Sequence, residues 1–120
     1  MSYCVTEGNA VADATLRQTS EGKQVANVVV RVDQRVRTGD GGYSDGPTID
    51  YEITVWGKPA EAFVRTASRG ARIFAAGELT VEEYDAGDGT RRIRNRITAD
   101  HHGVSSRFTP AVNTRRNGGR

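Results

Sequence analysis

One stretch, Thr48–Trp56, alternates so strictly between apolar and polar side chains that it restricts the chain to a fold rich in β-structure. Successive side chains of a strand point to opposite faces of a sheet, so this period of two predicts a strand with one buried face. The only tryptophan of the chain, Trp56, falls on the polar face. A large ring at such a position either caps the edge of a core or serves as a binding platform.

Alternation recurs along the chain and predicts four further strands. The most β-prone run, 24–36, places valines on one face and arginines on the other, and a glycine-rich link at 37–47 predicts a protruding hairpin after it. The Asp-Ala-Gly-Asp-Gly turn at 85–89 predicts a second hairpin. The expected strands are 3–9 (which 10–19 could continue past a bend), 24–36, 48–56, 72–84 and 90–101.

A single helix is predicted at 59–68. Proline is tolerated at its first position, and Ala60, Phe63 and Ala67 recur at helical spacing. The order strand, strand, strand, helix, strand, strand is typical of an OB-fold, an all-β, five-stranded antiparallel Greek-key barrel with one helix between strands three and four. The rival is a two-layer α+β sandwich with the helix packed across an open sheet.

The faces turned away from the apolar stripes share an unusual mixture of aromatic rings and guanidinium groups. Single-stranded nucleic acid is bound by such mixtures, because cations contact phosphates while rings stack on any base. The plainer interpretation is a solvated face, with Trp56 as a subunit contact and Phe74 inside the barrel, and a bulge would invert the assignment of faces. The candidate residues are Arg31, Arg35, Trp56, Phe74, Tyr84, Arg92, Arg94 and Arg96.

Short motifs from Tyr3 to about His101 resemble the bacterial single-stranded DNA-binding proteins, which are homotetramers of OB-folds. Their order and spacing over roughly a hundred residues carry the resemblance, since each motif alone is weak. The motifs are Gly8-Asn9, Thr15-Leu16-Arg17, Val25-Ala26-Asn27, Trp56-Gly57-Lys58 with Ala60-Glu61, Arg69-Gly70, Gly77-Glu78-Leu79 and Tyr84.

The resemblance implies sequence-independent binding and protection of single-stranded DNA during replication, recombination, repair or DNA uptake. Trp56 and Tyr84 match two positions at which the family stacks bases, and Lys58 belongs to the first of these motifs. Two other stacking positions carry Val36 and Asp50 instead. The resemblance also implies a homotetramer located in the cytoplasm, on the nucleoid.

Charge divides the chain into an expected domain, 1–103, and a short basic tail, 104–120. The segment from Gly103 onward has four arginines and no acidic residue, whereas residues 1–102 carry 13 basic and 15 acidic groups. Family members that organise replication end in an acidic tip that recruits other enzymes. We therefore expect a short-tailed paralogue, or a phage or plasmid copy, without such recruitment, and with a salt-sensitive basic tail.

No catalytic constellation is recognisable, so we expect a protein that is not an enzyme and uses no cofactor or metal. His101 and His102 lack metal-ligand spacing to Cys4 and are expected to be solvated. Asp33, Asp50 and Glu52 share a face with arginines, which favours ion pairs. No window is apolar enough to span a membrane. The alternatives are a protein-interaction module that uses the same face and, more remotely, an RNA-binding cold-shock-like module.

Overall fold

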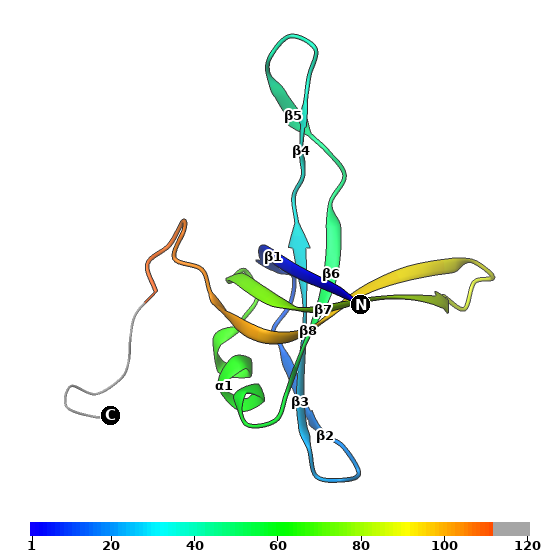
Figure 1. Cartoon of the computed structure of the whole chain (residues 1–120), viewed down its shortest axis with the longest axis vertical. Helices are drawn as coiled ribbons and strands as arrows, with labels where there is room; N and C mark the ends of the chain where they lie inside the picture. The colour runs from blue at the N-terminus through cyan, green and yellow to red at the C-terminus, as the bar shows by residue number, and fades with distance from the viewer. Residues whose placement is uncertain (112–120) are drawn as a thin grey trace.

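A computed structural model describes residues 1–111 of the chain, which form nine elements around one barrel (Figure 1). The expected helix is present, and the strand that contains Trp56 has the predicted position. In chain order the elements are β1 (Ser2–Ala10), β2 (Thr15–Gln18), β3 (Gln24–Val32), β4 (Arg35–Arg37), β5 (Tyr43–Asp45), β6 (Ile49–Trp56), α1 (Pro59–Thr66), β7 (Arg72–Asp85) and β8 (Arg91–Val104).

Five of the strands close into a ring in the order β1, β7, β8, β6, β3, with β1 returning to β3. The helix connects β6 to β7, the third and fourth barrel strands, so the OB-fold prediction is confirmed. One pairing differs from the all-antiparallel expectation, because β6 runs parallel to β8. A closed ring with an odd number of strands cannot alternate in direction all the way round, so at least one neighbouring pair must be parallel.

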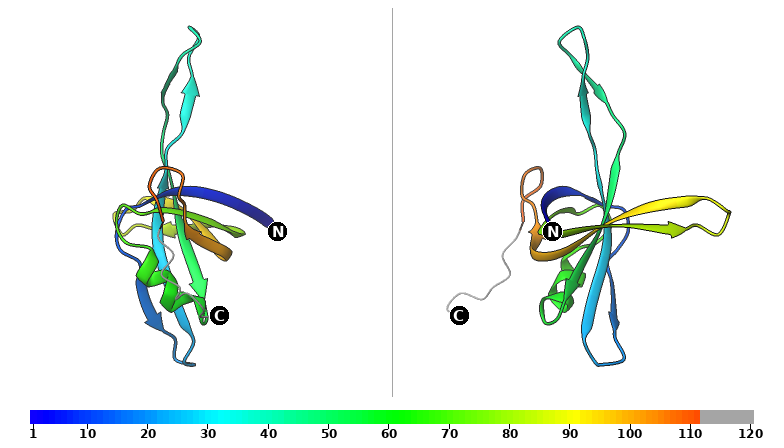
Figure 2. Two further views of the ribbon diagram at one scale, coloured as in Figure 1. Left: turned by 90° about the vertical axis from the view of Figure 1, so that its left-hand side faces the viewer. Right: turned by 45° about the vertical axis from the view of Figure 1, so that its right-hand side comes forward.

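Three two-stranded arms extend from the barrel (Figures 1 and 2). They are formed by β2 with β3, by β4 with β5, and by the outer parts of β7 and β8. The predicted strand 24–36 stops at Val32, and β4 then pairs with β5 as a separate hairpin, the protrusion expected from the glycine-rich link. Residues 10–19 do not continue β1, because Ala10 turns to exchange backbone hydrogen bonds with the chain at Gly70 and Ala71. Residues 15–18 form β2 and pair with β3 instead.

A β-bulge lies where β7 passes β8, and it changes which side of β8 faces the core. Ala76 pairs with His101 but Gly77 pairs with Ala99, so Asp100 is the extra residue. A Cβ atom at Gly77 would lie 1.9 Å from the carbonyl oxygen of Thr98, so glycine is required for this close approach. Beyond the bulge His102 faces inward, and its ring lies 4.9 Å from that of Phe63 at 75°, centroid to centroid. His102 is therefore not solvated as expected.

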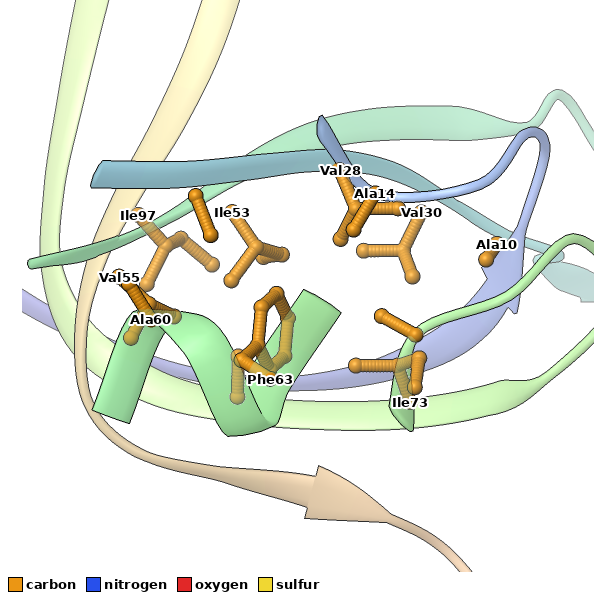
Figure 3. Packing of buried hydrophobic residues seen from close by; sticks show 13 residues of the cluster. Ala10, Ala14, Val28, Val30, Ile53, Val55, Ala60, Phe63, Ile73 and Ile97 are labelled. Atoms are coloured by element: carbon orange, nitrogen blue, oxygen red, sulfur yellow. The ribbon is translucent and has the colours of Figure 1, made fainter. Parts of the chain in front are cut away.

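The core fills the barrel beneath α1 (Figure 3). The predicted stripe of the helix is buried, and Phe63 is the largest fully buried side chain. Pro59 starts the helix, and the N–H of Ala67 donates to the carbonyl of Phe63 at its end, 2.8 Å away. Apolar residues from β3, β6, β7 and β8 surround the ring, among them Val28, Val30, Ile53, Val55, Ile73 and Ile97.

The packing of His102 predicts a pH dependence of stability. Burial lowers the pKa of His102 below its usual value of 6.5, and the charge of neighbouring His101 lowers it further. Below about pH 6.5 the unfolded chain binds more protons at His102 than the folded chain does. The contribution of neutral His102 to stability is therefore complete above this pH, and it is lost as the pH falls through the lower pKa of the folded state. We expect the free energy of unfolding, measured with urea, to fall less between about pH 7.5 and about pH 5.5 in His102→Gln than in the wild type. Equal differences would contradict the prediction. Because burial is the larger cause, His101→Gln should reduce the wild-type difference less than His102→Gln does.

Candidate nucleic-acid interface

The outer face of the barrel over β3, β6 and β8 carries two adjoining hollows. The first, of about 240 Å³, lies between β3 and the loop that precedes β2, and the second, of about 290 Å³, reaches the base of the β7–β8 arm. Both are lined by Val29 and Glu52, so together they form one groove across the barrel. The other lining residues are Val11, Ala12, Asp13, Thr15, Asn27 and Val28 in the first hollow, and Asp50, Tyr84, Ile93, Arg94 and Asn95 in the second.

The predicted aromatic residues occupy three different places relative to the groove. Tyr84 lines it, and the guanidinium of Arg94 lies 4.6 Å from the centroid of the tyrosine ring. Trp56 is 46% exposed on the same face of β6, four residues beyond Glu52, or about 13 Å along the strand. Phe74 is half-buried and lines neither hollow; it lies against Gly103, where an added Cβ would come within 2.9 Å of the ring.

Two of the predicted arginines are tied to carboxylates across strands, as their shared face indicated. Arg31 donates two hydrogen bonds to Asp50, at 2.8 and 3.0 Å, and this pairing raises the pKa of Arg31. Arg96 lies between two acids: its Nε is 2.8 Å from Glu52 and its Nη1 3.2 Å from Glu82. These two arginines offset most of the charge of the three carboxylates. Arg31 connects β3 to β6, and Arg96 on β8 connects to both β6 and β7.

The remaining predicted cations are more available to an anion. Arg92 makes only a long contact with Asp88, at 3.9 Å. Within residues 1–111, no carboxylate lies within 4.0 Å of the side chains of Arg35, Lys58 or Arg94. Lys58 immediately precedes α1 and follows Trp56 through Gly57, whose φ of 82° makes the turn. Arg35 lies away from the groove, on the arm formed by β4 and β5.

Several features of the face were missed from the sequence. Thr54 is buried on the outward parity and donates a hydrogen bond to Asn27, 2.9 Å away. Val11, Ala12 and Asp13 line the groove although no motif marks them. Exposed Phe108, beyond β8, has no strand parity that could have indicated its position. In the described part of the chain, no group of three His, Cys, Asp or Glu side chains could hold a metal ion, and no helix is long and apolar enough to cross a membrane.

A closed five-stranded barrel with one helix and a groove across its outer face is typical of the OB-fold class of oligonucleotide- and oligosaccharide-binding proteins. Residues 1–105 match the single-strand binding protein family, and the chain belongs to this family. The resemblance seen in the motifs is thereby confirmed.

Individual relatives agree with this membership. The chain is 32% identical over 107 residues to the single-stranded DNA-binding protein of Mycobacterium tuberculosis, and 34% identical over 101 residues to single-stranded DNA-binding protein 3 of Clostridium acetobutylicum. These matches cover 87% and 83% of this chain and 64% and 67% of the relatives. The chain thus spans about two thirds of the length of these two curated relatives.

Among solved structures, the small single-stranded DNA-binding protein from Streptomyces coelicolor has a similar fold. Its TM-score is 0.75 at 19% sequence identity, and the match covers 88% of this chain and 94% of that one. At this identity the likeness concerns the fold alone.

Proposed function

We propose that the protein binds and protects single-stranded DNA without regard to sequence, and does so in the groove over β3, β6 and β8. The observation that carries the proposal is the distribution of charge on this face. Its carboxylates Asp50, Glu52 and Glu82 are paired with arginines, whereas Arg94 is unpaired among residues 1–111 and lies over Tyr84. Arg31, Arg94 and Arg96 balance these three carboxylates in number, and Asp13, at the other end of the groove, accepts a hydrogen bond from the N–H of Arg69 at 2.7 Å. A strand can therefore meet a ring and a free cation on a face where arginines offset most of the acidic charge.

Within this proposal the nine predicted residues have different roles. Trp56 and Tyr84 stack bases, while Lys58, Arg92 and Arg94 contact phosphates. Arg35 lies on the β4–β5 arm and can contact a phosphate only beyond the groove. Arg31 and Arg96 act through their carboxylates and hold the strands in register, so they position the groove. Phe74, which is half-buried against Gly103, contributes least.

Membership of the single-strand binding family supports this function, since the relatives carry single-stranded DNA-binding in their names. The protein then works on the nucleoid in the cytoplasm, in replication, recombination, repair or DNA uptake. It is neither an enzyme nor a cofactor-dependent protein in this proposal. Recruitment of replication enzymes through an acidic tail is not part of it.

We also propose self-association into a homotetramer. Among residues 1–111, the stretch 2–8 of β1 pairs with β7 alone, so one edge of this strand is open to another chain. Tyr3 and Val5 on its outer face are 61% and 72% exposed, which provides apolar surface beside that edge. Sedimentation velocity gives the test, and a strict monomer at micromolar concentration would count against the tetramer.

The function can be tested through the fluorescence of Trp56, the only tryptophan. Titration with oligo-dT should quench the emission, because a base stacks on the indole, and the affinity should fall as salt concentration rises. A duplex of the same length is the control and should bind more weakly. Unchanged emission together with no gel shift at low salt would refute the proposal and favour a protein-interaction module.

Removing the cation Arg94, which is unpaired among residues 1–111, should change the salt dependence of DNA binding more than the preference among base sequences. For Arg94→Ala, we expect the slope of log K against log salt to decrease in magnitude by about 0.7, the value for one phosphate contact with a single strand. Arg91→Ala is the matched control, because Arg91 lies on the same arm but is paired with Glu83, 3.0 Å away. Equal slopes for both variants would show that Arg94 contacts no phosphate.

A further inference from the structure

A second cluster of arginines and an aromatic ring lies outside the groove, where the chain leaves β8. It surrounds a cleft of about 500 Å³ between the base of the β4–β5 arm and the segment that follows Val104. The cleft is lined by Asp33, Arg35, Arg72, Arg107 and Phe108. Apart from Arg35, none of these residues belongs to the predicted site.

Backbone and side-chain contacts hold this segment in place. The N–H of Ser105 donates to the carbonyl of Arg72 at 2.7 Å, and the N–H of Arg107 donates to Ser105 Oγ at 3.2 Å. The guanidinium groups of Arg72 and Arg107 lie 5.0 and 5.3 Å from the centroid of the Phe108 ring. Phe108 nevertheless stays 69% exposed, so its ring is presented to solvent rather than packed in the core.

The charge of the cleft is positive. Its three arginines outnumber its one acid, Asp33, which gives a net charge of +2 on the lining residues. Arg72 also pairs with Glu7, 2.8 Å away, and this hydrogen bond lowers the pKa of the Glu7 carboxyl. Within residues 1–111, no carboxylate lies within 4.0 Å of Arg35 or Arg107, so these two cations remain available to an anion.

The strand register connects this cleft with the groove. Asn9 of β1 is paired on one side with Arg31 of β3 and on the other with Arg72 of β7. Neighbouring strands are about 4.8 Å apart, so Arg31 and Arg72 are separated by about 10 Å across the barrel surface. Arg31 binds Asp50, which lines the groove, and Arg72 lines the cleft. A row of polar and charged side chains, with both arginines paired to acids, therefore leads from one site to the other.

We propose that this cleft is a second contact site for single-stranded DNA, which continues the path of a strand beyond the groove. Arg35 and Arg107 hold successive phosphates, and an unstacked base packs beside Phe108 and the Arg107 guanidinium. An exposed ring among guanidinium groups suits single-stranded DNA, which offers both phosphates and unstacked bases. Inorganic phosphate has no base that could stack on the ring, and the bases of a duplex are already stacked on one another. The proposal rests on the proposed function of the groove and extends it.

The test compares two lengths of oligo-dT on the full chain. A strand of about 8 nucleotides can be held by one OB-fold groove, whereas one of about 24 exceeds the usual site. For Phe108→Ala and Arg107→Glu we expect a loss of affinity of about fivefold or more for the longer strand, and no change for the shorter one. The number of nucleotides occluded per chain should also decrease. Arg65→Ala, an exposed arginine on α1, is the matched control.

The outcomes separate this proposal from that of the groove. Trp56→Ala should weaken both lengths, and failure of the wild type to bind either length would refute the function of the groove itself. If the wild type binds both lengths but Arg107→Glu binds the longer strand normally, the cleft is not a DNA site and Phe108 only anchors the chain after β8. Arg107→Glu decides this even if Phe108→Ala lowers the melting temperature, because the Arg107 side chain is exposed and lies outside the core.

Discussion

Replacing Trp56 with alanine is expected to weaken the binding of single-stranded DNA by about 5- to 140-fold. One base stacked on an aromatic ring contributes roughly 1–3 kcal/mol, and each 1.4 kcal/mol corresponds to about tenfold in affinity. Trp56 can be removed without a cavity, because it is 46% exposed and is not part of the core. Fluorescence anisotropy with labelled oligonucleotides measures the change, since the variant has no tryptophan.

Two comparisons make the Trp56 result specific. Trp56→Phe retains a ring and should retain most of the affinity, and the loss in Trp56→Ala should be similar for oligo-dT, oligo-dC and oligo-dA, because stacking does not depend on the identity of the base. Normal binding together with a smaller assembly in sedimentation would instead identify Trp56 as a subunit contact. A loss confined to one base would contradict sequence-independent binding.

Replacing Phe63 with alanine is expected to lower the free energy of unfolding by about 3–5 kcal/mol, as is usual for buried phenylalanines. Its ring is 1% exposed and packs in the centre of the barrel beneath α1 (Figure 3). The ring of His102 lies against it, 4.9 Å away between centroids. Because small domains are stable by only about 5–15 kcal/mol, this one substitution removes a large share of the total. Urea unfolding followed by circular dichroism measures the difference.

The control for Phe63 is on the same helix. Arg65 is exposed and contacts only Glu61 through a 3.5 Å ion pair, so Arg65→Ala should change the free energy of unfolding by no more than about 0.5 kcal/mol. The loss of free energy of unfolding in Phe63→Leu should lie between those in Arg65→Ala and Phe63→Ala. A loss below about 1 kcal/mol for Phe63→Ala would mean that α1 does not close the barrel as described.

Strand parity predicted the outward face of the candidate site and the presence of ion pairs on it, but not which arginines are paired. The parity of the strand through Trp56 placed this residue and Glu52 on the outward face correctly, because parity is a local property of the backbone. Which arginines are free depends on the register between strands. Arg96 and Glu52 are 44 residues apart in the chain, yet they are direct neighbours on β8 and β6. Spacing along the sequence contains no such information.

The sequence by itself determined the period of each segment, and with it the strands, the helix and the buried stripes. These follow from short-range backbone geometry and from the turn chemistry of glycine and aspartate. From them the order of elements was enough to predict an OB-fold, and the motifs were enough to indicate the family.

Only the tertiary structure decided which features far apart in the chain meet. Ring closure made β6 and β8 parallel neighbours, the bulge at Gly77 turned His102 rather than His101 toward Phe63, and the return of the chain after β8 brought Phe108 to Arg72. The physical reason is common to all three. Closing a barrel juxtaposes residues according to strand order and register, which are global properties, and a single extra residue in one strand inverts every face beyond it.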